Sequence, residues 1–409
     1  MKAERSYPRA VVTAKAENAV LQGHPWIYDA EITALTGQPE NGGLVDAVSR
    51  KGRYLGTGLY SKESKIRLRL ISRNANDVFD DAFWERKLRW AWEYRKAVLR
   101  EEDLTCCRVI FGEADGFPGL TVDRFGPLLS AQVLSVGMET RKHTILPMLA
   151  DILRRDGQRI DGIYERSDVK LREKEGLEQV KGWLPLPGET PPASAVTEIT
   201  ENGVKYLVDV ENGQKTGFFL DQKFNRQAVA RLARGRTVLD CFTHTGSFAL
   251  NAALGGAAHV TAVDVSESAV EMARANAARN GLSDRVECVC ANVFDLLPEL
   301  EGQPARYDFI ILDPPAFTKS RATVANAITG YKEINYRAMK LLPRGGYLAT
   351  CSCSHFATEE KFTAMLRSAA RDAGVQLRQI EARQQAPDHP ILWGVEETNY
   401  LKFYLFQVI

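Results

Sequence analysis

Short apolar runs broken by glycine and asparagine characterise the first 72 residues of the chain. Residues 42–48, 54–60 and 66–71 are the clearest of these runs. The last one alternates polar and apolar positions, as a half-buried strand does. We therefore expect a small β-rich module over residues 1–72.

The next segment mixes helical and strand periodicities. Apolar residues recur at helical spacing through residues 80–100, which predicts an amphipathic helix. A proline-rich stretch at residues 185–192 is typical of a linker, so we expect a middle α+β domain over residues 73–190. Its other predicted elements are strands at residues 109–111, 120–123, 129–134 and 160–165, and a helix at residues 139–155.

Residues 191–409 begin with a predicted hairpin, in which residues 196–200 and 204–210 flank Glu201-Asn202-Gly203. Asn-Gly favours a tight type I′ turn. Strands and helices then alternate, which predicts an α/β fold built on a parallel, doubly wound sheet. The predicted strands cover residues 238–240, 259–264, 286–290, 309–312 and 347–351.

One helix of this segment carries local signals at both ends. It is expected over residues 266–280, where Ser268 and Glu271 can form a capping box. Gly281 fits the position just after the helix.

The composition is that of an ordinary globular protein, with 26% charged and 44% hydrophobic residues and a net charge of +1. The chain is not a polycation, so a nucleic-acid-binding surface must be local. No apolar run approaches the roughly 18–20 residues that span a bilayer, and residues 1–10 lack the core of a signal peptide. We expect a cytoplasmic protein that does not associate with a membrane. Its cysteines are then reduced, and because their spacing matches no zinc site we expect no metal.

A candidate cofactor site follows the first strand of the predicted sheet. That strand ends at Asp240, and a turn containing Phe242, Thr245 and Gly246 leads into a helix. Doubly wound sheets bind ligands at this end of their strands, and a glycine lets the backbone approach a ligand closely. The turn lacks the full G-x-G-x-x-G pattern, which argues against a pyrophosphate site.

Polar residues also follow the next three strands. Asp264 suits a ribose diol, Asn292 can touch an adenine edge, and Asp313 opens an Asp-Pro-Pro sequence. The acidic residue after the second strand does not by itself separate S-adenosylmethionine (SAM) from NAD. The Asp-Pro-Pro sequence and the missing glycine pattern favour a SAM-dependent methyltransferase over an NAD-linked enzyme.

Longer motifs are distributed over nearly the whole chain, at residues 23–28, 112–120, 165–168, 211–222, 313–315 and 352–354. With these motifs the chain resembles the bacterial and archaeal ribosomal RNA large-subunit methyltransferases of the RlmI-like group, which are SAM-dependent cytosine carbon-5 methyltransferases. The resemblance implies an N-terminal PUA-type RNA-binding domain and a class I, Rossmann-like methyltransferase domain with a mixed seven-stranded sheet at residues 191–409. It also implies 23S ribosomal RNA as the substrate.

The resemblance also implies functions for further residues. In the family the segment 211–222 helps to enclose SAM, which implicates Asp221 and Gln222, and relatives suggest a homodimer. The chain departs from the family at Asn292, where Asp is frequent, and at His355, where relatives vary.

Carbon 5 of cytosine is a poor nucleophile, so its methylation requires covalent catalysis. A thiolate that adds to carbon 6 turns the ring into an enamine, which can take a methyl group. Cys353 lies just past the fifth strand, and Asp313, just past the adjacent fourth strand, can act near nitrogen 3 of the ring. Cys351 competes as the nucleophile, but its place within the strand indicates burial. Ala316 stands where another group of RNA cytosine methyltransferases has a cysteine.

Candidate RNA contacts lie in the N-terminal module. His24 and Trp26 can stack on bases, and Lys15, Arg53 and Arg67 can hold phosphates. The alternative is structural, because Trp26 can belong to the core of the module and Arg67 to a solvated strand face.

Two other functions stay open. Adenine-N6 and guanine-N2 methyltransferases carry a related motif without a nucleophilic cysteine, although their aromatic residue comes one position earlier than Phe317 does here. A non-catalytic RNA-binding factor for ribosome assembly could also keep the fold.

Overall fold

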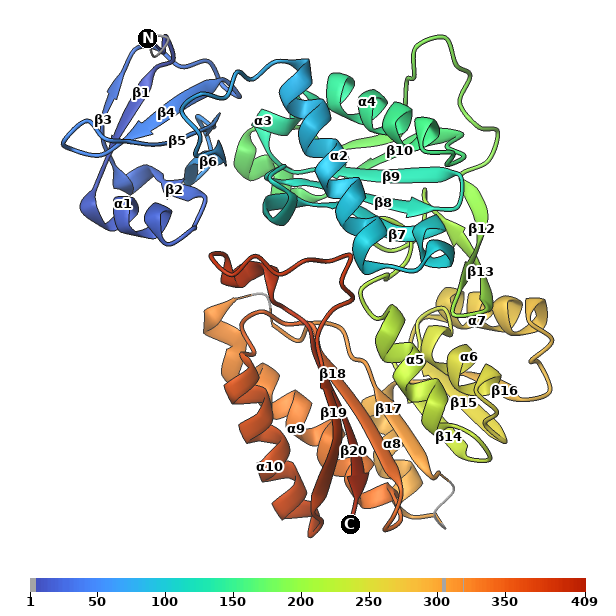
Figure 1. Cartoon of the computed structure of the whole chain (residues 1–409). Helices are drawn as coiled ribbons and strands as arrows, with labels where there is room; N and C mark the ends of the chain where they lie inside the picture. The colour runs from blue at the N-terminus through green and yellow to red at the C-terminus, as the bar shows by residue number, and fades with distance from the viewer. Residues whose placement is uncertain (1–4, 304–306, 319) are drawn as a thin grey trace. The chain divides into compact units, whose positions relative to one another are not determined.

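The computed structural model describes residues 5–303, 307–318 and 320–409 (Figure 1). The chain forms two compact units. The first contains the residues up to Ile199 together with Leu207–Leu220 and Pro387–Thr398, and the second contains Thr200–Tyr206, Asp221–Ala386 and Asn399–Ile409. The chain therefore passes between the units several times.

A six-stranded sheet opens the first unit. Its strands are β1 (Arg9–Val12), β2 (Trp26–Tyr28), β3 (Ile32–Thr36), β4 (Leu44–Val48), β5 (Tyr54–Tyr60) and β6 (Ile66–Ser72). The order is β2-β6-β5-β4-β1-β3, and β1 and β4 are parallel neighbours. Helix α1 (Ala14–Leu21) adds Ala16 and Val20 to the core. The β-rich module is confirmed, including its three predicted strands.

The second sheet of this unit has five strands, β7 (Cys106–Phe111), β8 (Leu120–Phe125), β9 (Leu128–Val133), β10 (Gly162–Ser167) and β11 (Val180–Leu184). They lie in the order β11-β10-β9-β8-β7. Helix α2 (Asp81–Val98) confirms the predicted amphipathic helix. The helix expected over residues 139–155 is instead two helices, α3 (Val136–Glu139) and α4 (Lys142–Arg155). The chain bends between them because Thr140 ends the first helix before Arg141 caps the second.

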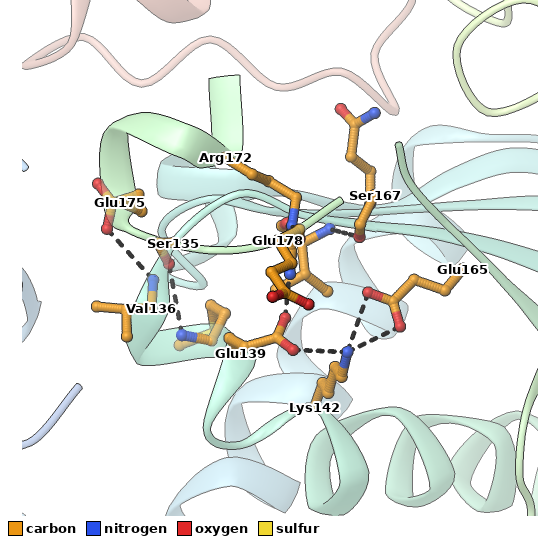
Figure 2. A network of polar contacts seen from close by, with 12 residues as sticks. Ser135, Val136, Glu139, Lys142, Glu165, Ser167, Arg172, Glu175 and Glu178 are labelled. Carbon is orange, nitrogen blue, oxygen red and sulfur yellow. Dashed lines mark hydrogen bonds and ion pairs between the residues drawn. The ribbon is translucent and has the colours of Figure 1, made fainter. Parts of the chain in front are cut away.

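A buried network of ion pairs supports this second sheet (Figure 2). The Lys142 ammonium lies 2.9 Å from a carboxylate oxygen of Glu165 and 2.7 Å from one of Glu139. Arg172, which is 1% exposed, lies 3.0 Å from the other oxygen of Glu139. Glu165 opens the motif at residues 165–168, so this part of the motif has a structural role.

Residues 387–398 complete the first unit. The guanidinium of Arg95 donates a hydrogen bond of 2.9 Å to the backbone carbonyl of Asp388, and the backbone N–H of Arg108 donates one of 2.8 Å to the Asp388 carboxylate. Arg95 is fully buried and also pairs with Asp115 at 2.5 Å. Asp115 belongs to the motif at residues 112–120, so that motif anchors helix α2.

The predicted hairpin is present as β12 (Val196–Glu201) and β13 (Val204–Asp209). Asn202 has a φ of 55° and Gly203 a φ of 82°. A type I′ turn requires positive φ at both central residues, so the Asn-Gly prediction is confirmed.

A seven-stranded mixed sheet dominates the second unit, as the resemblance implied. Its strands are β14 (Thr237–Cys241), β15 (His259–Asp264), β16 (Val286–Cys290), β17 (Phe309–Leu312), β18 (Tyr347–Ser352), β19 (Leu377–Arg383) and β20 (Lys402–Val408). The order is β16-β15-β14-β17-β18-β20-β19. The first five in this order are parallel, and β20 runs antiparallel to both β18 and β19. All five predicted strands are confirmed.

The helices of the second unit are α5 (Lys223–Leu232), α6 (Ser247–Leu254), α7 (Glu267–Arg279), α8 (Val293–Glu301), α9 (Val324–Leu341) and α10 (Glu359–Ala373). Helix α7 begins with Ser266, whose hydroxyl accepts from the N–H of Ala269. The predicted cap at Ser268 is wrong, because the helix starts immediately after the turn that follows β15 and Ser268 already lies in its first turn. Gly281 follows the helix with a φ of 65°, as predicted. Among the helices of the described residues, none is both long and apolar enough to cross a membrane.

Candidate active site

Asp240 lies at the carboxyl end of β14 and is fully buried. Its Oδ2 accepts hydrogen bonds from the Thr243 hydroxyl at 2.6 Å and from the N–H of Ala249 at 2.9 Å. Its Oδ1 is buried and has no hydrogen-bond partner within the described part of the chain. A buried carboxylate oxygen without a partner is costly, so Asp240 is prepared for a ligand that donates hydrogen bonds or carries positive charge.

The turn after β14 has an unusual backbone. Phe242, His244 and Gly246 have φ values of 64°, 51° and 86°. A residue with a side chain pays about 1–2 kcal/mol for a left-handed conformation, and such strain clusters at functional sites. At Gly246 an added Cβ would lie 3.2 Å from the Cβ of Ala273. Gly246 therefore allows both the turn and the close approach of helix α7.

Asp264 ends β15 and holds the same turn in place. Its two oxygens accept from the backbone N–H groups of His244 at 2.9 Å and Ser266 at 3.0 Å. A carboxylate has about four acceptor positions, so each oxygen can accept again from a diol. Burial lowers the pKa of His244, which keeps that ring neutral at pH 7. Thr245 follows it and its carbonyl accepts from Asn276 at 3.1 Å.

Three acidic side chains gather around the ends of β14 and β17. Burial raises the pKa of Asp240 to about 7 and that of Asp313 to about 6. The charge of Asp313 raises the pKa of Asp240 further, and the charge of Asp221 does the same for Asp313, whereas Arg226 opposes the shift at Asp313. These strand ends thus carry an excess of acidic groups, whose mutual repulsion a cationic ligand would relieve. SAM, with an ammonium and a sulfonium group, fits this requirement.

Asp221 and Gln222 stand just before helix α5. The Tyr400 hydroxyl donates to Asp221 at 2.7 Å, and the Gln222 amide donates to Asp313 at 2.9 Å. The carbonyl oxygen of Gln222 accepts from Asn225 at 2.6 Å, which fixes the orientation of its amide. The structure therefore brings Gln222 and Asp313 together, and both belong to the predicted site.

Aromatic rings gather near the ends of β14 and β17. The centroid of the Phe242 ring lies 6.5 Å from that of Phe294 and 6.4 Å from that of Phe317. Asn292 caps helix α8: its side-chain oxygen accepts from the N–H of Phe294, and its amide donates to Asp295 at 2.9 Å. The side chain of Asn292 is thus partly engaged with its own helix.

Cys353 follows the last residue of β18 and is partly exposed, whereas Cys351 is fully buried within the strand. This confirms the expected difference between the two cysteines. Burial, with Asp313 nearby, raises the pKa of the Cys351 thiol well above its usual value. Strands β17 and β18 are parallel neighbours, with Leu312 opposite Thr350. Asp313 and Cys353 therefore leave the same edge of the sheet.

The five predicted RNA contacts differ in how firmly they are held. The Trp26 indole donates to Glu113 at 2.9 Å, and the His24 ring accepts from the N–H of Trp26 at 3.3 Å. Arg67 pairs with Asp29 at 2.9 Å. The remaining two side chains are Lys15, which is 86% exposed and pairs with Glu31, and Arg53, which is exposed.

Several residues of the site were not among those predicted from the sequence. Thr243 and Tyr400 hold Asp240 and Asp221 through their hydroxyls. Arg226, which is 2% exposed, forms a buried pair with Glu201. The Arg226–Glu201 contact spans 25 residues and the Tyr400–Asp221 contact spans 179 residues. Local sequence patterns cannot predict contacts at such separations, whereas Thr243 lies within the predicted turn.

Comparison with known proteins connects this geometry to a family. Residues 183–407 match the model of a family described as S-adenosylmethionine-dependent methyltransferase, and residues 10–73 match that of a PUA-like domain. A protein of Klebsiella pneumoniae (strain 342) named ribosomal RNA large subunit methyltransferase I is 40% identical over 404 residues, which cover 98% of this chain and 99% of that protein. A protein of the same name from Escherichia coli (strain SMS-3-5 / SECEC) is 38% identical over 402 residues, with the same coverage.

Solved structures agree on the fold. A SAM-dependent methyltransferase from Streptococcus mutans superimposes with a TM-score of 0.81 at 23% identity. A second methyltransferase structure, determined in complex with SAH, superimposes with a TM-score of 0.82 at 22% identity. Each comparison covers 98% of this chain and 99% of the other.

Proposed function

Because this chain belongs to the S-adenosylmethionine-dependent methyltransferase family that includes ribosomal RNA large subunit methyltransferase I, we propose that it methylates carbon 5 of a cytosine in 23S ribosomal RNA. The reaction runs through a covalent adduct with Cys353. The observation that carries this proposal is a partly exposed cysteine directly after β18, at the sheet edge where Asp313 follows β17.

Each residue of the site has its own role in the proposed reaction. The Cys353 thiolate adds to carbon 6 of the cytosine, and the carboxyl of Asp313, whose pKa is raised to about 6, stabilises the ring near nitrogen 3. SAM, when bound, would supply the methyl group to carbon 5 and would leave as S-adenosylhomocysteine. Loss of the carbon-5 proton to a base then expels the thiolate and restores the aromatic ring.

We assign the cofactor contacts to the ends of successive strands. Asp240, with an Oδ1 that lacks a partner among the described residues, receives the ammonium of SAM, and Asp264 receives the ribose diol. Asp221 and Gln222 close the pocket next to Asp313. The remaining contacts are the turn residues Phe242, Thr245 and Gly246, and Asn292 at the adenine edge.

The N-terminal PUA-like domain supports an RNA substrate, and the names of the relatives support ribosomal RNA. Lys15 and Arg53, the most accessible of the predicted contacts, are assigned to phosphates. His24, Trp26 and Arg67 complete the assigned surface. Their side chains already make contacts inside the first unit, so they act as oriented groups rather than mobile ones.

A methyltransferase that acts on adenine N6 or guanine N2 is the alternative activity. It would need an aromatic side chain next to Asp-Pro-Pro that is available to the base. The Phe317 ring packs against Tyr331 with centroids 4.5 Å apart, which favours a role in the core. We therefore retain the carbon-5 assignment.

The test compares Cys353→Ala with Cys351→Ala in the full-length protein. Transfer of a labelled methyl group from SAM to 23S ribosomal RNA is measured, followed by mass spectrometry of the nucleosides. Cys353→Ala should lower the rate by roughly three orders of magnitude or more and leave SAM affinity unchanged, while Cys351→Ala should stay active. RNA that contains 5-fluorocytosine should form a stable adduct with the wild-type protein and with Cys351→Ala, but not with Cys353→Ala. Product at another base, or near-normal activity of Cys353→Ala, would contradict the proposal.

A further inference from the structure

Lys402 is a buried lysine at the start of β20. This strand pairs with β18, which ends immediately before Cys353. Lys402 is opposite Ser352 in the antiparallel register between β20 and β18. Its ammonium donates a hydrogen bond of 2.7 Å to the backbone carbonyl of Ser354. Lys402 is therefore paired in register with the residue before Cys353 and hydrogen-bonded to the residue after it.

The charge of this lysine is not neutralised by a carboxylate ion pair in the part of the chain that the structure describes. Lys402 is 9% exposed, and lysines are almost never buried unless they are paired. The nearby carboxylate of Glu359 accepts a hydrogen bond from Tyr404 at 2.7 Å instead. Among the described residues this buried cation has one hydrogen-bond acceptor, the Ser354 carbonyl, so its position calls for a further explanation.

Three described groups respond to the charge of Cys353, and they come from three elements: Tyr331 on α9, Cys351 on β18 and Lys402 on β20. Of these three, Lys402 is the cation. Burial lowers the pKa of Lys402 to about 8, whereas the charges of Cys353 and Glu359 act in the opposite direction. Because such coupling is reciprocal, a positive Lys402 must favour a negative Cys353.

We propose that the ammonium of Lys402 activates Cys353 by stabilising its thiolate. This inference rests on the proposed function, in which Cys353 attacks carbon 6 of cytosine. The thiol proton passes to water before RNA binds, and Lys402 keeps its proton and its hydrogen bond to Ser354. The cation is thus held at the Ser354 carbonyl, one residue after Cys353, both when the thiolate forms and when it leaves the product. Lys402 is a positioning residue, because it acts on the nucleophile and not on the base.

The test measures how fast iodoacetamide alkylates Cys353 as a function of pH. Mass spectrometry of the peptides follows Cys353 and, as an internal control, the exposed Cys290. Lys402→Met and Lys402→Gln should each shift the midpoint for Cys353 upward by about one pH unit or more, because one unit corresponds to a tenfold change in the thiolate equilibrium. Lys402→Arg should keep the wild-type midpoint, and Cys290 should not change in any variant.

Methyl transfer supplies a second readout. At pH 7 the rate of Lys402→Met should fall about tenfold, and it should recover as the pH is raised, since more thiolate then forms without the cation. SAM affinity, measured by calorimetry, shows that each variant is folded. An unchanged alkylation midpoint in both neutral variants overturns the role of Lys402 even if Cys353→Ala is inactive. An active Cys353→Ala instead overturns the proposed nucleophile, whatever the midpoints are.

Discussion

The side-chain amide of Gln222 donates a hydrogen bond of 2.9 Å to the carboxylate of Asp313. Gln222 caps helix α5 and Asp313 follows β17, so the contact joins two segments that are 91 residues apart. The donor favours the ionised form of Asp313, whereas burial favours the protonated form. Gln222 therefore helps to set the pH at which the carboxyl group of Asp313 ionises.

SAM affinity should increase with pH. Asp240 and Asp313 have pKa values raised to about 7 and about 6, and positive charge on the ligand favours their ionised forms. Binding below these pKa values must therefore release protons, so the dissociation constant should fall between pH 5.5 and about pH 8 and then level off. Calorimetry in buffers with different ionisation enthalpies measures the proton release directly. A pH-independent affinity would contradict the acidic pocket.

Gln222→Met should raise the pKa of Asp313, because the variant loses the hydrogen bond that favours the carboxylate. The pH at which SAM affinity falls to half of its high-pH value should then be higher than in the wild type, whatever affinity the variant has lost at high pH. The same calorimetric titration measures this shift. Gln379→Met, at an exposed position of β19, is the matched control and should follow the wild-type curve.

Asp240→Asn should weaken SAM binding about ten- to a hundredfold, since hydrogen bonds to a charged group contribute about 1.5–3 kcal/mol. Asp308→Asn is the matched control. Asp308 accepts from the N–H of Thr237 at the amino end of β14, which is the opposite end of the same strand from Asp240. Calorimetry should show near-normal affinity for Asp308→Asn. Equal losses in the two variants would indicate a general effect on the sheet.

Lys142→Met should destabilise the first unit by about 3–5 kcal/mol, because it leaves the buried carboxylate of Glu165 without its partner. The double variant Lys142→Met/Glu165→Met should recover most of this loss. Tryptophan fluorescence during denaturation in urea isolates the effect, since all six tryptophans lie in the first unit. A single variant as stable as the wild type would show that the network of Figure 2 contributes little.

Lys15→Ala and Arg53→Ala should weaken RNA binding without affecting SAM. Both side chains are exposed, and each lost phosphate contact should reduce the slope of affinity against salt concentration by roughly 1. Lys361→Ala, an exposed basic residue of α10 in the second unit, is the control. Filter binding or anisotropy at several salt concentrations measures the slopes. Identical slopes in all variants would remove Lys15 and Arg53 from the RNA surface.

The sequence predicted those features that depend on neighbours along the chain. Alternation identified the strands, Asn202-Gly203 identified its turn, and Asp240 was found because it ends an apolar strand. Two serines only two residues apart could not be distinguished as caps, because both offer a hydroxyl near the start of α7. Lys402 gave no signal at all, since its importance arises only when β20 pairs with β18.

The first unit cannot form all of its native contacts until nearly the whole chain has been synthesised. Arg95 is fully buried among early residues, yet one of its hydrogen-bond acceptors is the carbonyl of Asp388, 293 residues further on. Ribosomes add about 5–20 residues per second, so the N-terminal unit waits many seconds for its last segment to leave the exit tunnel. During that interval Arg95 pairs with Asp115 but lacks the Asp388 carbonyl, and the N–H of Arg108 lacks the Asp388 carboxylate. The unit that is translated first is therefore completed only near the end of synthesis, and a ribosome that stalls before residue 387 holds a nascent chain in which neither unit is complete.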